Sequence, residues 1–180
     1  MPRLVPSPRA AVAAVVSLGL TAAAVAVSPA LHRSAAAQNS FDADLFALIN
    51  QDRAAAGVPA LRWNDQLGSI AESQPYAGCG FTIAGRAEDM ISRNYFSHTI
   101  CGAQNVFNVM QAAGAPYLSA GENIGWEAGI TNPAIAAQYL NQEYMNSPEH
   151  RANIMGPYHY VGTAWAVAPN GAAYIAVEFG

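Results

Sequence analysis

Apolar residues after position 40 recur at helical spacing in several segments of the chain. Leu45, Phe46 and Ile49 share one face of a helix that we expect over residues 41–56, and Gly57 is a suitable end for it. The same kind of spacing predicts shorter helices over residues 64–74, 86–94 and 106–113. The first two thirds of the chain are therefore expected to be mainly helical.

A longer helix is expected over residues 133–145. Pro133 suits its first turn, where the missing N–H does no harm, and Thr131 is a candidate N-cap. Ile135, Leu140 and Tyr144 are expected to form its buried stripe.

The end of the chain has the pattern of a β-hairpin. Residues 160–167 and 172–179 are rich in β-branched and aromatic side chains, and Asn170-Gly171 between them is a strong turn signal. Residues 117–129 contain three glycines and no helical period, so Glu122 is expected on a loop or a short strand. Helices first and antiparallel strands last indicate an α+β layered domain.

The first 37 residues have the layout of a secretory signal peptide. Arg3 and Arg9 precede an uncharged apolar stretch over residues 10–27, and small residues at 35–37 offer a cleavage site. An uncleaved membrane anchor is the alternative, which Gly19 and Pro29 disfavour because they interrupt the apolar run. We expect a signal peptide over residues 1–37 and one domain over residues 38–180.

The net charge of the chain limits which classes of binding partner we expect. The chain has 180 residues, 52% of them hydrophobic and 11% charged, which is typical of a globular protein. After residue 37 it has five arginines, no lysine and twelve carboxylates, a formal net charge of −7. This sign argues against nucleic acid or an anionic membrane as the main partner, and it is compatible with divalent cations.

Cys79 and Cys101 are the two cysteines of the chain. In an exported protein an even number of cysteines predicts a disulfide, which typically stabilises the fold by about 3 kcal/mol. Two buried free thiols are the alternative, and the spacing excludes a CxxC pair.

Three polar segments carry the candidate chemistry. His98 ends Tyr95-Phe96-Ser97-His98, Glu122 lies in Gly121-Glu122-Asn123-Ile124, and His150 lies in residues 146–154, where a turn opened by Ser147-Pro148 is expected. Two imidazoles and a carboxylate suit zinc, or a water held for general-base chemistry. Taken singly, each histidine is better explained as held by a backbone partner at a helix end, and Glu122 could equally cap a turn.

Other residues have weaker claims. Glu143 and Glu149 each offer a second carboxylate, and we expect His159, at the start of a strand, to be structural. Ser97 and Ser147 lie near histidines, but neither lies in a G-x-S-x-G turn, which disfavours a serine hydrolase.

The order of these three segments, followed by Val161-Gly162 and a terminal hairpin, resembles the CAP superfamily, in particular its bacterial SCP-like extracellular branch. The resemblance implies a three-layer α-β-α sandwich with a central antiparallel sheet. It also implies a cleft lined by two histidines and two glutamates, in which His98, Glu122 and His150 match directly. Either Glu143 or Glu149 would be the fourth member, and Tyr144 stands where the family usually has tryptophan.

From this resemblance we expect a secreted, monomeric binding module for an unknown extracellular ligand, with no membrane span after signal cleavage. Its cleft would hold a divalent cation, zinc foremost, through His98 and His150, while Glu122 orients an imidazole or a bound water. No catalytic residue is assigned. The alternatives are a metal-assisted hydrolase with Glu122 as base, and a carrier of lipid or sterol.

Overall fold

The structure is a computed structural model that describes residues 35–71, 85–102, 104–115 and 117–180, with side chains from residue 40 onward. Six helices and six strands lie in these ranges. The helices are α1 (Ala35–Ala55), α2 (Asp65–Ala71), α3 (Arg86–Ser92), α4 (Val106–Ala112), α5 (Pro133–Asn146) and α6 (Pro148–Ile154). The strands are β1 (Arg62–Trp63), β2 (Thr99–Cys101), β3 (Gln104–Asn105), β4 (Gly121–Ala128), β5 (Tyr160–Val167) and β6 (Ala172–Phe179).

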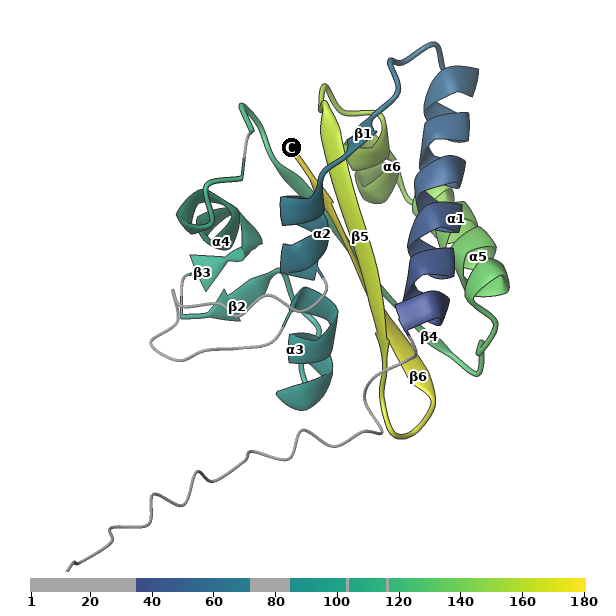
Figure 1. Cartoon of the computed structure of the whole chain (residues 1–180), viewed down its shortest axis with the longest axis vertical. Coiled ribbons are helices and arrows are strands. Elements are labelled where there is room, and N and C mark those ends of the chain that lie inside the picture. The colour runs from purple at the N-terminus through teal and green to yellow at the C-terminus, as the bar shows by residue number, and fades with distance from the viewer. Residues whose placement is uncertain (1–34, 72–84, 103, 116) are drawn as a thin grey trace, which may run out of the picture.

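Three layers make up the domain. A four-stranded sheet in the order β1-β5-β6-β4 lies between α1, α5 and α6 on one face and α2, α3 and α4 on the other (Figure 1). This confirms the three-layer α-β-α sandwich. The sheet is mixed rather than wholly antiparallel, because the short strand β1 pairs with β5 in parallel.

Successive side chains of β5 point to opposite faces of the sheet and pack into a hydrophobic core on each face. Val161 and Trp165 pack toward α1, where the Trp165 ring stacks on Phe41 with ring centroids 4.6 Å apart. Ala164, on the opposite face, packs with Met90 of α3 and Ala71 of α2. All six side chains are buried, so the sheet is covered on both sides along this strand.

A pair of glycines sets the distance between β5 and α2. A Cβ added to Gly162 would lie 2.0 Å from the backbone nitrogen of Gly68. Only a residue without a side chain fits there, because backbone on the other side cannot move aside. This contact explains why Gly162 interrupts an otherwise β-rich strand.

Several expectations are confirmed and others are wrong in detail. The hairpin of β5 and β6 is confirmed, as is the helix from Pro133, but Asn132 rather than Thr131 caps it, accepting from the N–H groups of Ala134 and Ile135. Ile135 is 55% exposed and does not belong to the buried stripe.

Two segments are more regular than expected. Residues 121–128 form a full strand instead of a loop or short strand, and residues 148–154 form α6 instead of a turn. Glycines weaken a strand pattern, and Pro148 opens α6 at its first turn, where proline is tolerated. The segments that carry Glu122 and His150 are therefore held by regular structure.

The leader and one cysteine lie outside the described residues. Residues 1–34 are not described, and α1 already begins at Ala35, so the signal peptide over residues 1–37 stays a prediction. Cys101 ends β2, but Cys79 lies outside the described ranges, and the disulfide also stays a prediction. Within the part of the chain that is described, no helix combines the length and the apolar character needed to cross a bilayer.

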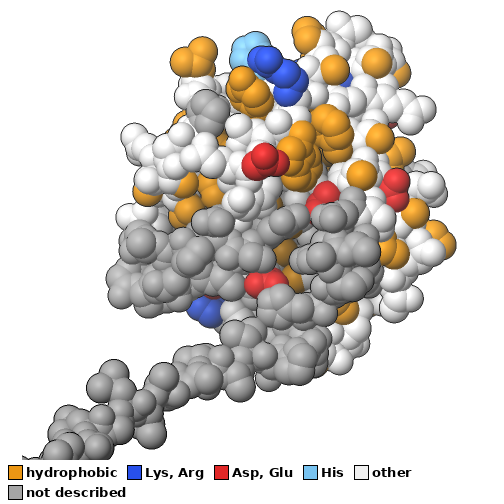
Figure 2. Space-filling view, viewed as in Figure 1, with side chains coloured by type: hydrophobic (Ala, Val, Ile, Leu, Met, Phe, Trp, Pro, Cys, Tyr) orange, Lys and Arg blue, Asp and Glu red, His pale blue; other side chains and the backbone are white. Residues whose placement is uncertain are grey.

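Charged side chains are sparse on the visible surface. On the face of the described residues shown in Figure 2, arginine side chains occur in small separate groups, and acidic side chains are scattered among other residues.

Candidate functional site

Glu122 lies at the centre of a buried polar cluster. It is on β4, the edge strand of the sheet, and its side chain is only 1% exposed. Its Oε1 accepts a hydrogen bond from Nε of Arg86 at 2.5 Å, and its Oε2 lies 2.5 Å from Nδ1 of His98. Both carboxylate oxygens are therefore already engaged within the protein.

Arg86 is a member of the site that the sequence did not reveal. It opens α3, is fully buried, and donates to Glu122, to the Tyr95 hydroxyl at 2.8 Å and to the Ser97 carbonyl. Burial alone would lower the pKa of Arg86, but the charge and hydrogen bond of Glu122 raise it above its ordinary value. A permanently charged guanidinium thus pairs with the Glu122 carboxylate and holds the 95–98 segment in place.

The contact with Glu122 sets the tautomer of His98. Because the carboxylate is paired with Arg86, it accepts a hydrogen bond, so Nδ1 of His98 carries the proton and donates. Nε2 is then the ring nitrogen that Glu122 leaves available, on a side chain that is 59% exposed. A carboxylate that fixes an imidazole in this way is the usual partner of a metal-binding histidine.

Asparagines hold His150 beside the sheet. His150 lies in the first turn of α6, and its carbonyl accepts from Nδ2 of Asn123 at 3.0 Å. Asn153, one turn further along α6, donates to the Glu122 carbonyl at 3.0 Å and to Oδ1 of Asn123 at 2.8 Å. These bonds attach α6 to β4 at the level of Glu122, a role that residue type and spacing did not indicate.

The two histidines approach β4 from opposite faces of the sheet. Burial lowers the pKa of His150, and the nearby charge of His98 lowers it further, so the rings are close enough to affect each other. The ring of His150 also lies against Tyr144, with centroids 4.8 Å apart. The geometry therefore brings His98, Glu122 and His150 together around one edge strand.

A pocket of about 300 Å³ opens beside this cluster. Its walls come from the C-terminal half of β4, from α5 and α6, and from Phe96. Glu143 and His150 both line it, whereas Glu149 is exposed on α6 and is not among its lining residues. Of the two glutamates proposed for the fourth position, only Glu143 faces the same space as His150.

The described residues offer two histidines rather than a complete metal cage. They contain no group of three or more His, Cys, Asp or Glu side chains close enough to hold a metal ion together. His159 is exposed, and its backbone N–H bonds to the Gly180 carbonyl, as expected for a structural residue. Any cation in the cleft would have two imidazole ligands and otherwise water or ligand atoms.

A second buried carboxyl group lies beside Glu122, on the neighbouring strand β6. Glu178 of β6 pairs with Glu122 in the strand register and is fully buried. Burial, and then the charge of Glu122, raise the pKa of Glu178 well above its usual range. Burial therefore favours the neutral, protonated form of Glu178. Its position in a strand of apolar residues was the only signal of this in the sequence.

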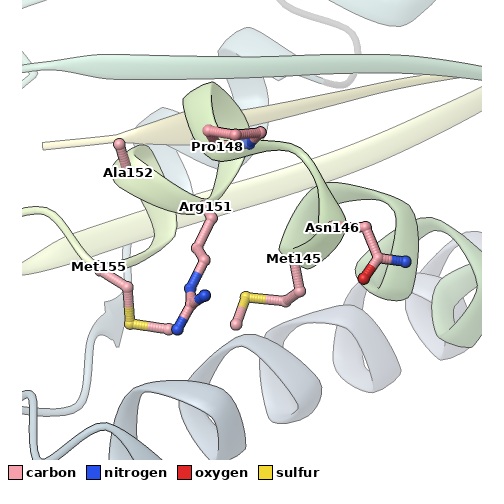
Figure 3. Close-up of a pocket in the computed structure, with 6 residues that line it drawn as sticks. All are labelled: Met145, Asn146, Pro148, Arg151, Ala152 and Met155. Atoms are coloured by element: carbon pink, nitrogen blue, oxygen red, sulfur yellow. The ribbon is translucent and has the colours of Figure 1, made fainter.

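Arg151 follows His150 in sequence but faces a different hollow. This hollow, of about 390 Å³, lies where α5 meets α6, and Figure 3 shows the Arg151 side chain extending between Met145 and Met155. Consecutive helical residues point about 100° apart, which accounts for the separation. The guanidinium next to His150 in sequence is thus not part of the cleft.

Comparison with known proteins identifies relatives of this arrangement. Residues 82–179, more than half of the chain, match the family model described as CAP: Cysteine-rich secretory protein family. The uncharacterized protein YkwD of Bacillus subtilis is 26% identical over 128 residues, which cover 71% of this chain and 43% of YkwD. The chain thus spans less than half the length of that relative.

Solved structures agree on the fold. An extracellular protein containing an SCP domain from Bacillus anthracis superposes with a TM-score of 0.58 and 24% identity, over 79% of this chain and 40% of that protein. An outer surface protein of Borrelia burgdorferi gives a TM-score of 0.55 and 14% identity, over 83% of this chain and 96% of that protein. Sequence identities this low support a shared fold but not a shared function.

Proposed function

The chain belongs to the CAP family of cysteine-rich secretory proteins, and from that premise we propose that it is a secreted binding module whose cleft holds a divalent cation, zinc foremost, between His98 and His150. The fold alone leaves function open, because one fold carries many roles. The proposal therefore rests on the geometry of the cleft.

The observation that carries the proposal is the bond between Glu122 and His98. It engages Nδ1 of His98 and directs Nε2 away from Glu122, and burial favours the neutral form of His150. Neutral imidazoles are what zinc binds, and a second-shell carboxylate raises the basicity of the ligating ring. With two protein ligands we expect weaker binding than at a structural zinc site, which has four.

Glu143 is our proposed fourth member of the cleft. It lines the pocket with His150, and a carboxylate there can hold a cation-bound water. The hydrolase alternative is less well supported, because a general base needs a free oxygen and both oxygens of Glu122 are engaged by Arg86 and His98.

Export is a separate part of the proposal. The leader-like residues 1–37 support it, and structural neighbours are described as an extracellular protein and an outer surface protein. A Cys79–Cys101 disulfide would form in that oxidising environment. Mass spectrometry of the exported protein, with and without reductant, would show both the cleavage site and the pairing.

Zinc titration by calorimetry tests the metal site. We expect one zinc per chain in the wild type and loss of that binding in His98→Ala and in His150→Ala. His159→Ala is the matched control, because it removes an exposed imidazole outside the cleft, and it should bind as the wild type does. Unchanged stoichiometry in the His98→Ala/His150→Ala double variant would disprove the proposal.

A further inference from the structure

The described walls of the pocket beside the histidines carry two carboxylates. Glu127 of β4 and Glu143 of α5 both line it, and of the described residues in its walls none is Lys or Arg. Partial burial raises the pKa of Glu127, and the nearby charge of Glu143 raises it further. Two carboxylates that repel each other across a pocket are stabilised by a positive charge placed between them.

Exposed aromatic rings stand at this pocket. Phe96 is 47% exposed and Trp126 is 52% exposed, and both are lining residues. Phe96 is held in place by an edge-to-face contact with Tyr174, with ring centroids 6.3 Å apart. Tryptophan is the best aromatic partner for a cation, because the face of its ring is electron-rich.

A buried hydroxyl group gives the second, independent indication of a ligand. Tyr144 lines the pocket and is only 2% exposed, yet its hydroxyl has no hydrogen-bond partner among the described residues. The hydroxyl oxygen lies close to the backbone of Gly125, another lining residue, since a Cβ there would be only 2.9 Å from it. Buried hydroxyl groups are normally satisfied, and an unsatisfied one beside a pocket indicates a missing polar partner.

We propose that this pocket binds the cationic side chain of a basic peptide or protein, a lysine or an arginine, between Trp126 and the carboxylates of Glu127 and Glu143. The alkyl part of the side chain would lie against the aromatic rings, its charge would face the two carboxylates, and an N–H would reach the Tyr144 oxygen. A volume of about 300 Å³ suits a side chain rather than a bare metal ion. This inference deepens the proposed function, and it rests on it only in taking the cleft as a binding site.

The test compares two small probes that differ in charge but hardly in shape. Nα-acetyl-lysine N-methylamide and Nα-acetyl-norleucine N-methylamide are titrated into the protein, with binding followed by calorimetry and by NMR shifts of the tryptophan indole N–H groups. EDTA is present throughout, so the result does not depend on zinc. We expect saturable binding of the lysine probe and at least about tenfold weaker binding of the norleucine probe.

Matched variants locate the binding. Glu127→Gln/Glu143→Gln should weaken the lysine probe at least about tenfold, and Trp126→Ala should weaken it as well. Glu149→Gln removes the same charge from an exposed residue outside the pocket and should bind as the wild type does. The two glutamine changes remove a repulsion rather than a contact, so the thermal midpoint should not fall, and it serves as the folding control.

Three outcomes would overturn the inference. They are absence of lysine-probe binding, equal binding of the norleucine probe, and equal weakening by Glu149→Gln. His98→Ala should keep lysine-probe binding while it abolishes zinc binding, so the failure of either proposal can be told from the failure of the other.

Discussion

The guanidinium of Arg86 and the carboxylate of Glu122 form an ion pair in which neither side chain is more than 1% exposed. The pair joins the start of α3 to the edge strand β4, and through Glu122 it also sets the orientation of His98. A pair this deeply buried is destabilising to break, because one charge would remain without a partner in a region of low dielectric.

The losses of stability caused by replacing Arg86 and by replacing Glu122 should therefore be non-additive. Arg86→Met should lower the free energy of unfolding by about 3–5 kcal/mol, measured by urea denaturation, because it leaves Glu122 buried and unpaired. The double variant Arg86→Met/Glu122→Gln should lose less than the sum of its two single variants. Arg62→Met, at an exposed arginine that contacts Tyr160, is the control and should change stability by about 0.5 kcal/mol or less. Additive losses would contradict a coupled pair.

Asn153 should matter both for stability and for metal binding. Asn153→Ala removes two hydrogen bonds that attach α6 to β4 and leaves Oδ1 of Asn123 without that donor, so we expect a loss of about 2 kcal/mol. His150 would then be less well placed, and zinc affinity measured by calorimetry should fall. Asn146→Ala, at an exposed position near the end of α5, should affect neither quantity. Unaltered zinc affinity in a folded Asn153→Ala protein would count against a positioning role.

Glu178 should make the protein less stable as the pH rises. Its carboxyl group has a pKa near 4.5 when unfolded and a much higher one when folded, so above pH 4.5 the folded state binds the extra proton. Stability is lost over this window at up to about 1.4 kcal/mol per pH unit, until the pH reaches the folded pKa. Glu178→Gln cannot titrate, so its advantage over the wild type should grow from pH 5 to pH 8 in urea denaturation. Glu149→Gln should show no such trend, and a constant difference for Glu178→Gln would show that Glu178 is ionised in the fold.

Zinc binding should weaken on acidification, but at a lower pH than the ordinary pKa of histidine would predict. A histidine must lose its proton to bind zinc, and the pKa of His150 lies below the ordinary 6.5 because of burial and the nearby His98. His150 therefore keeps its neutral form to a lower pH than an ordinary histidine does, and protons compete for this ligand only at correspondingly lower pH. Calorimetry from pH 7.5 down to pH 5 would show this, and binding that is constant down to pH 5 would exclude histidine ligands.

The sequence predicted those elements whose local pattern agrees with their tertiary surroundings. The hairpin of β5 and β6 and the helix α5 have strong local signals, namely Asn170-Gly171 and Pro133, and their packing adds to them. The strand at residues 121–128 was harder to predict from the sequence, because Gly121 and Gly125 lower its β-propensity. Gly125 is required by packing instead, since a Cβ there would lie 2.6 Å from a methyl carbon of Leu140.

The site was predictable in its titratable residues but not in its supporting ones. His98, Glu122 and His150 stand out by residue type, whereas Arg86 and Glu178 are brought to Glu122 only by the packing of α3 and the register of β6. Asn123 and Asn153 lie in the recognised segments, but their mutual hydrogen bond depends on how α6 meets the sheet. Such long-range partners have no local signature that the chain alone could display.

The place of β4 at the end of the sheet links ligand access to the association state of the protein. An edge strand can pair with a strand from another molecule, and a second copy that extended the sheet along β4 would occupy the space in front of His98, His150 and the pocket beside them. Growth of the sheet and occupation of the cleft would then exclude each other. A ligand bound in the cleft would accordingly protect the edge of the sheet against self-association.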